Sequence, residues 1–174
     1  MTVEITVGHT WDGQVIPKGH HSRFTLRRME RGIVLEVDAP YWGDTKPAEL
    51  PGSTWELWNY EVVEWFVVGQ GSPRPYLEVE LGPHGHYLVL QLCGVREIVR
   101  KELPLTFHAE ILGARWFGRA VIPEQFLPPG PFTHNAFAIH GVGEHRVYYS
   151  HTPVPGHGPD FHRIGCYSEL GIFR

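Results

Sequence analysis

The chain has 174 residues, of which 42% are hydrophobic and 20% are charged, so one core can be buried and the surface stays charged. A net charge of −4 argues against a nucleic-acid partner, because phosphate binding needs clustered lysine and arginine side chains. No apolar run approaches the roughly 18 residues that a membrane span needs. We therefore expect one soluble domain over residues 1–174, with no nucleic-acid or membrane partner.

The N-terminus and the cysteines indicate the compartment. The first residues carry Glu4 and no long apolar segment, which disfavours secretion. Cys93 and Cys166 are too few to brace a domain of this size, and neither belongs to a CxxC pair. We expect a cytoplasmic protein with two reduced thiols.

Short runs rich in Val, Ile, Leu, Tyr and Phe are separated throughout by glycine and proline, a texture typical of many short strands joined by turns. The expected strands, in chain order, are 2–7, 23–28, 32–38, 61–68, 76–81, 86–92, 96–101, 106–111, 115–121, 135–140 and 146–150. A long loop is expected from Pro40 to Gly52 and a helical turn near Pro123 to Phe126. With almost no helical periodicity elsewhere, the pattern predicts an all-β fold, an antiparallel β-sandwich.

The clearest unit is a hairpin in which YLEVEL and HYLVLQL flank residues 82–85. A four-residue turn places one set of side chains on the core side: Leu77, Val79, Leu81, Leu88 and Leu90. The other side then carries Tyr76, Glu78, Glu80, Tyr87 and Gln91. This polar side is either solvent surface or the floor of a ligand cleft, since polar ligands need aromatic and hydrogen-bonding groups together.

Several segments in order over nearly the whole chain resemble a small family of uncharacterised proteins found in animals and bacteria. They are HTWDG (9–13), LWNYEVVEWF (57–66), YLEVELGPHGHYLVLQLCG (76–94), FAIHG (137–141), PVP (153–155) and PDFH (159–162). This resemblance implies a fold and no particular activity.

A second set of motifs is similar to carbohydrate-binding family 9 and DOMON-like β-sandwiches. The motifs are YEVVEWF (60–66), YLEVE (76–80), and Phe161 and His162 leading to Tyr167 and a final strand from Leu170 to Phe173. Members of that superfamily bind sugars or haem on a sheet face, which is what the resemblance implies here. The strand that often carries Asn and Arg in the sugar binders reads NAFAIH in this chain, with His140 near the arginine position.

Two glutamates are candidate site residues. Glu64 shares a strand face with Val62 and Phe66, and a carboxylate on an apolar face must be paired, hydrogen-bonded or protonated. It is either a cleft residue or an ion-pair partner. Glu78 lies two residues from Glu80 on one strand face, which suits a solvated surface or an acid and base pair.

Histidine is unusually frequent, with 12 copies. Metal sites need imidazoles that converge on one point, and no HExxH motif, paired CxxC or dense Asp/Asn loop is present. We therefore predict no metal ligands and no cofactor. His9 and His140 fall in the family-matching segments and join the candidate site.

The sequence thus predicts non-catalytic binding of a small polar, carbohydrate-like ligand in a sheet-face cleft lined by Glu64, Glu78, His140, Trp42 and His9. Trp42, in the long loop, is the best candidate to stack on a ligand. Two alternatives stay open: an enzyme that uses histidine and glutamate for acid–base or metal-assisted chemistry, and a protein-interaction scaffold.

Overall fold

The computed structural model describes residues 1–171, and its regular secondary structure consists of β-strands and short 3-10 turns. The strands are β1 Thr2–Val7, β2 His9–Thr10, β3 Ser22–Met29, β4 Gly32–Pro40, β5 Val62–Val68, β6 Pro75–Leu81, β7 Tyr87–Cys93, β8 Ile98–Arg100, β9 Thr106–Leu112, β10 Arg115–Pro123, β11 Phe132–His140, β12 Val147–Ser150 and β13 Ser168–Leu170. Short 3-10 turns are η1 Lys18–His20, η2 Leu57–Asn59, η3 Glu124–Phe126, η4 Gly143–His145 and η5 Ile164–Cys166.

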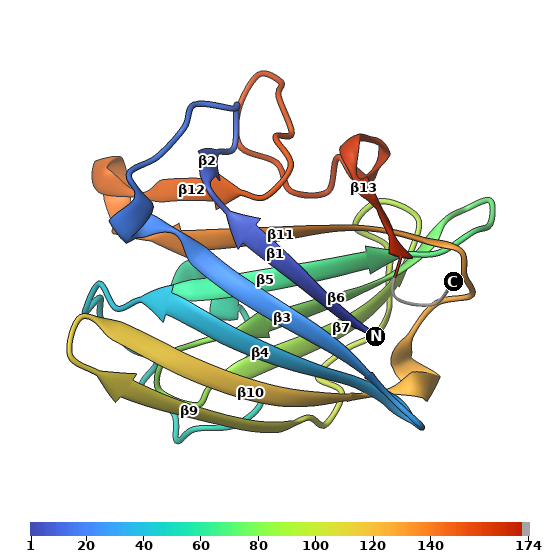
Figure 1. Cartoon of the computed structure of the whole chain (residues 1–174), viewed down its shortest axis with the longest axis horizontal. Helices are drawn as coiled ribbons and strands as arrows, with labels where there is room; N and C mark the ends of the chain where they lie inside the picture. The colour runs from blue at the N-terminus through green and yellow to red at the C-terminus, as the bar shows by residue number, and fades with distance from the viewer. Residues whose placement is uncertain (172–174) are drawn as a thin grey trace.

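The strands form two antiparallel sheets. The five-stranded sheet has the order β1, β3, β4, β10, β9, and the eight-stranded sheet has the order β2, β12, β11, β5, β6, β7, β8, with β13 also paired to β11. Figure 1 shows the five-stranded sheet in front of the eight-stranded sheet. The predicted antiparallel β-sandwich is confirmed.

Smaller expectations have mixed outcomes. The helical turn is present as η3, and both cysteines are free thiols. The last strand covers Ser168–Leu170, earlier than the predicted 170–173, of which residues 172 and 173 lie outside the described part of the chain. Among residues 1–171, no helix has the length and apolar character to cross a membrane.

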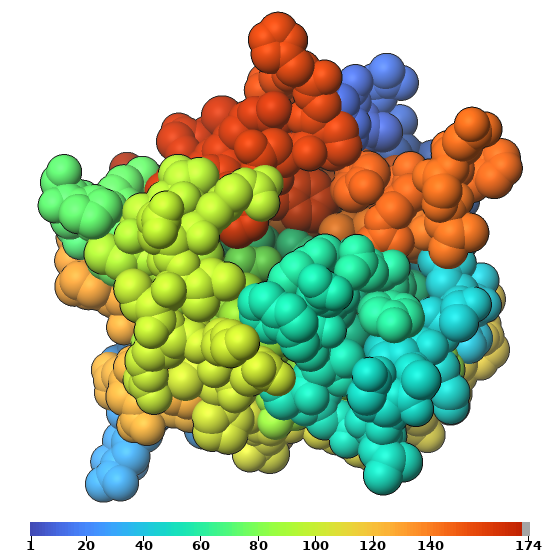
Figure 2. All heavy atoms as spheres, turned by 180° about the vertical axis from the view of Figure 1, so that it is seen from behind, coloured from blue at the N-terminus to red at the C-terminus, as the bar shows by residue number. Residues whose placement is uncertain are grey.

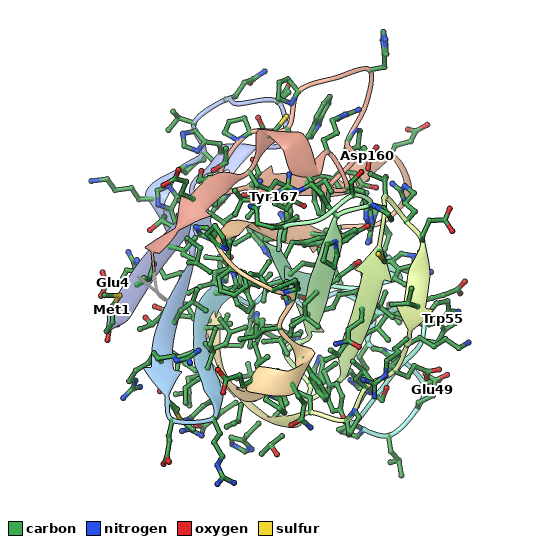
Figure 3. The ribbon with its side chains drawn as sticks, turned by 90° about the vertical axis from the view of Figure 1, so that its right-hand side faces the viewer. Met1, Glu4, Glu49, Trp55, Asp160 and Tyr167 are labelled. Atoms are coloured by element: carbon green, nitrogen blue, oxygen red, sulfur yellow. The ribbon has the colours of Figure 1, made fainter. Side chains whose placement is uncertain are left out.

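The eight-stranded sheet is buried on both faces. Its inner face packs against the five-stranded sheet through side chains such as Trp65, whereas its outer face carries a second apolar cluster that includes Phe66 and Phe137. Chain segments from residues 154–167 cover part of that outer face. In Figure 3, Asp160 and Trp55 lie on this outer side, opposite Met1 and Glu4. Because both faces are covered, all seven residues of β5 are buried.

The register of the β6–β7 hairpin differs from the prediction. Leu81 pairs with Tyr87, so the turn covers five residues, 82–86, instead of four. His86 belongs to the turn, where its ring nitrogen Nε2 lies 2.9 Å from the carbonyl oxygen of Glu49. A shift of one residue moves every side chain of a strand to the other face.

The β6 arm is correct, with Leu77, Val79 and Leu81 in the core between the sheets. The β7 arm is reversed, since Leu88 and Leu90 join the outer cluster. Tyr87 packs against the inner core, and the Gln91 side chain donates a hydrogen bond to the carbonyl of Phe126. The prediction failed because β7 is apolar on both faces, so alternation did not distinguish the two registers.

Candidate functional site

A cleft of about 280 Å³ lies on the outer face of the eight-stranded sheet, and we call it the outer cleft. Its lining comes from η2, which contains Trp58, from β5 to β8 and the loop between β7 and β8, from the end of β11, from β12 and from residues 159–162. Figure 2 shows the hollow between the yellow-green segment of residues 90–100, the red segment near 160, the teal segment near 58 and the orange segment near 145. Distant parts of the sequence therefore build one site.

Three carboxylates gather at the floor. Glu64 on β5 lies opposite Glu80 on β6, and Glu78 precedes Glu80 by two residues, so all three project from the outer face. One oxygen from each can be chosen such that the three oxygens lie within 4.8 Å of one another. Glu64 and Glu78 line the outer cleft, and Glu80 is fully buried beside them.

Burial changes the protonation of these acids. It raises the pKa of Glu64 well above its usual value, and the charge of Glu78 adds to the effect, while Arg146 opposes it. Burial likewise raises the pKa of Glu78 to about 7, against the opposing effects of Glu80 and Arg96. For Glu80, burial is again the largest cause of a strongly raised pKa, followed by the charges of Glu64 and Glu78. At neutral pH the floor thus holds protons that it can share with a ligand.

A hydrogen-bonded chain orients His162 over this floor. The backbone N–H of Arg96 donates to the Tyr76 hydroxyl over 2.9 Å, and that hydroxyl lies 2.7 Å from His162 Nδ1. Because the hydroxyl accepts from Arg96, its own proton points to Nδ1, and we infer that Nε2 carries the ring proton. Nε2 lies 3.9 Å from Glu78 Oε2. Burial lowers the pKa of His162 to about 4, so this contact is not an ion pair at neutral pH.

Asp160 fixes the rim of the cleft beside His162. Its Oδ1 accepts hydrogen bonds from the Arg96 guanidinium over 2.8 Å and from the backbone N–H of His162 over 3.0 Å. The residues PDFH, which carried the family resemblance, therefore shape this wall and place His162.

Aromatic side chains form the rest of the wall. Phe161 stacks on Phe137 of the sheet, with ring centroids 3.8 Å apart and an angle of 8° between the rings. Trp58 and Tyr148 also line the cleft. Arg146 holds the Trp58 loop in place, because its guanidinium donates to the carbonyl oxygens of Trp58, Asn59 and Gly141. The site thus combines rigid aromatic surface with a polar floor.

Of the predicted site residues, Glu64 and Glu78 meet in the outer cleft, whereas Trp42 and His140 do not. Alternation along β11 sends Phe137 and Ile139 to the outer face and His140 to the inner side of the sheet. There His140 stacks on Trp42 with centroids 3.8 Å apart and also contacts Tyr149 of the inner core. The expectation that His140 joins the two glutamates in one cluster is wrong.

His9 lies elsewhere again. It belongs to β2, the edge strand of the eight-stranded sheet, where it pairs with Ser150 of β12. In the sheet order, β12 and β11 separate it from β5. His9 is therefore not part of the outer cleft.

The predicted set missed several residues that line the cleft or its floor: Trp58, Glu80, Arg96, Tyr148, Asp160, Phe161 and His162. A signal existed for some of them, since Trp58 and residues 160–162 lie in family-matching segments and Glu80 shares the face of Glu78. Nothing local in the sequence marks Arg96 or Tyr148, because their place depends on how loops pack over the sheet.

Comparisons with known proteins place the chain among relatives. No protein-family model matches it. UPF0462 protein C4orf33 homolog of Mus musculus is 44% identical over 179 residues, which cover 98% of this chain and 92% of the mouse protein. UPF0462 protein C4orf33 of Homo sapiens is 41% identical over 180 residues, which cover 98% of this chain and 88% of the human protein. A candidate carbohydrate-binding protein from Bacteroides uniformis ATCC 8492 aligns in structure with a TM-score of 0.68 and 16% identity, over 96% of this chain and 84% of that one, which shows a shared fold.

Proposed function

The chain belongs to the UPF0462 family, and we propose that it binds a small polar, carbohydrate-like ligand in the outer cleft without catalysing a reaction. The observation that carries this proposal is the convergence of aromatic rings and hydrogen-bonding groups in one hollow. Ligand sites for small molecules typically pair apolar and aromatic walls with a few placed polar groups. The description of the B. uniformis protein of the same fold as a candidate carbohydrate-binding protein is consistent with this role.

The chemistry of the cleft suits a polyol. The C–H face of a sugar ring can pack on Trp58 or Tyr148, while its hydroxyls exchange hydrogen bonds with Glu64 and Glu78. A protonated carboxyl can donate as well as accept, which matches the dual character of a hydroxyl group. Arg96 at the rim adds N–H groups, which donate hydrogen bonds to ligand oxygens and accept none.

Tryptophan variants test the location of this site. A thermal-shift screen of mono- and oligosaccharides supplies the ligand, and calorimetry then measures its Kd with wild type, Trp58→Ala and Trp42→Ala. We expect Trp58→Ala to raise the Kd about tenfold or more, equivalent to about 1.4 kcal/mol, because a stacking surface is lost. Trp42→Ala removes the same side chain on the inner side of the sheet and should leave the Kd within about twofold once folding is verified.

The outcomes separate the candidate functions. If Trp42→Ala weakens binding and Trp58→Ala does not, the ligand site is not the outer cleft. If no saccharide shifts the melting temperature, the carbohydrate-like ligand class is rejected and the protein-interaction scaffold becomes the better account.

An acid–base enzyme is the second candidate, because the oxygens of Glu64 and Glu78 approach within 4.8 Å. Retaining glycosidases place two carboxyl groups about 5 Å apart. Product analysis after long incubation with any saccharide that binds decides between the two functions. Intact saccharide supports a binding protein, and cleaved saccharide supports the enzyme.

We also propose a cytoplasmic location, which the two free thiols Cys93 and Cys166 support. Fractionation of cells that express the protein tests it, and recovery in a secreted or membrane fraction would reject it.

A further inference from the structure

The acidic groups at the floor of the outer cleft lack a directly paired lysine or arginine among the described residues, although Arg146 and Arg96 act on them from farther away. Within residues 1–171, no lysine or arginine nitrogen lies within 4.0 Å of a carboxylate oxygen of Glu64, Glu78 or Glu80. In the described part of the chain, the basic side chain within that range is His162, whose Nε2 lies 3.9 Å from Glu78 Oε2. Protons compensate these buried acids in the absence of a ligand, and a bound cation can take their place when the protons leave.

The unpartnered oxygens are a separate observation. Glu80 is 0% exposed, and its carboxylate oxygens accept no hydrogen bond from an N–H or hydroxyl group of the described residues. Its carboxyl group shares one hydrogen bond with that of Glu78, which leaves the second Glu80 oxygen without a partner. Glu78 is 4% exposed, and its Oε2 also lacks a hydrogen-bond partner among the described residues. Buried polar atoms are almost always hydrogen-bonded in folded proteins, so orphaned oxygens that face one another indicate a group that binds between them.

From this arrangement we propose that Glu64, Glu78 and Glu80 form a binding site for a calcium ion at the floor of the outer cleft. The three side chains offer an all-oxygen donor set, which suits a hard cation and disfavours metals that prefer sulfur or imidazole. Calcium takes six to eight oxygens at about 2.3–2.6 Å, so oxygens on opposite sides of the ion lie about 4.6–5.2 Å apart. The three carboxylate oxygens lie within 4.8 Å of one another, close enough for one such ion to contact all three. Calcium tolerates irregular geometry, whereas magnesium demands a near-ideal octahedron, and competition between the two ions distinguishes them.

The cleft supplies both access and the remaining ligands. Glu64 and Glu78 line its floor, so an ion can enter from solvent and keep water molecules on its open side. Sugar hydroxyls could later replace that water, but the ion site itself needs no saccharide. This inference therefore goes beyond the proposed ligand binding, and each can fail without the other.

Terbium luminescence tests the site directly, because Tb³⁺ replaces Ca²⁺ at oxygen sites and is excited by a nearby tryptophan. Trp58 lines the same cleft and serves as the donor. With wild-type protein and no saccharide, we expect saturable emission that Ca²⁺ displaces and that Mg²⁺ displaces at least tenfold less effectively. Titration of metal-free protein with Ca²⁺ in two buffers of different ionisation enthalpy should also show proton release, since ligating carboxylates must lose their protons.

Two matched variants locate the ion. Glu80→Gln keeps the shape of the side chain and removes its charge, and we expect it to weaken Ca²⁺ binding at least tenfold. Glu97→Gln makes the same change at an exposed position near the cleft and should leave Ca²⁺ binding within twofold. If Glu80→Gln does not fold by circular dichroism, Glu64→Gln provides the same test.

The proposal would be overturned if the terbium emission did not saturate. It would also be overturned if Glu80→Gln and Glu97→Gln both bound Ca²⁺ as tightly as wild type. The absence of both terbium emission and calorimetric heat with the wild-type protein would overturn it as well. Saccharide binding measured in the presence of a chelator reports separately on the proposed function.

Discussion

Val79→Asp should prevent folding or lower the free energy of unfolding by several kcal/mol. Val79 lies in the middle of β6, is 0% exposed, and packs in the core between the two sheets. An aspartate there would bury a charge without a partner, or would force a protonated carboxyl among apolar neighbours. Chemical denaturation followed by tryptophan fluorescence measures the loss.

Val99→Asp is the matched control, because Val99 is 61% exposed on β8. It should change the free energy of unfolding by less than about 0.5 kcal/mol, as is usual for surface substitutions. A Val79→Asp protein as stable as the Val99→Asp protein would show that the inner face of β6 is not the core.

Glu80→Gln should make the protein more resistant to unfolding at pH 8 than wild type, with a smaller difference at pH 5. The pKa of Glu80 is raised in the folded state by burial and by Glu64 and Glu78. The folded protein therefore holds a proton that the unfolded chain releases above its ordinary pKa, so the stability of wild type falls as the pH rises toward the folded-state pKa. Glutamine keeps the shape and does not titrate.

The size of the effect follows from one proton. Over the range between the two pKa values, the stability advantage of Glu80→Gln should grow by up to about 1.4 kcal/mol for each pH unit. Thermal or chemical unfolding is measured from pH 5 to pH 8 with a chelator present, so that no metal compensates the charge. If the free energy of unfolding changed with pH in the same way for wild type and Glu80→Gln, the inference that Glu80 is protonated in the folded protein would be wrong.

Buried histidines change the stability with pH in the opposite direction, because they destabilise the folded protein as the pH falls. Burial lowers the pKa values of His134 and His140 to about 4, so their contribution is present above pH 6.5 and is lost as the pH falls toward 4. Both lie outside the carboxylate cluster and change wild type and variant alike, whereas His162, whose pKa burial also lowers to about 4, lies beside Glu78. The difference between the two proteins therefore reports Glu80 together with the acids coupled to it, Glu64 and Glu78.

Strand positions could be predicted from the sequence because glycine, proline and β-branched residues mark turns and strands locally. The β6 arm was correct for the same reason, since Leu77, Val79 and Leu81 alternate with polar residues. The facing of β7 could not be derived, because apolar residues occupy both of its faces and the turn was one residue longer than assumed. When both faces of a sheet are covered, both faces carry apolar residues, so apolar and polar residues no longer alternate along the strand.

The candidate site was predicted only in part, because the sequence marks unusual residues but not the face that each loop covers. Glu64 and Glu78 stood out because acidic residues interrupt apolar strands, and burial bears out their unusual setting. Trp42 was favoured for its loop, but that loop returns to the inner side of the sheet, where the backbone N–H of Trp42 donates to the Glu61 carboxylate over 2.8 Å. Which face a loop covers depends on such tertiary contacts, and local sequence does not encode them.

A residue-resolved map of the bound ligand tests the outer cleft most directly. Indole N–H signals in a ¹H–¹⁵N spectrum, assigned with Trp58→Phe and Trp42→Phe, are followed while the saccharide found in the screen is titrated. We expect the Trp58 signal to shift until it saturates, as should the amide signals of Glu64 and Glu78, while the Trp42 signal stays in place. A saturable shift of Trp42 and His140 with Trp58 unchanged would contradict it and move the ligand to the inner side of the sheet.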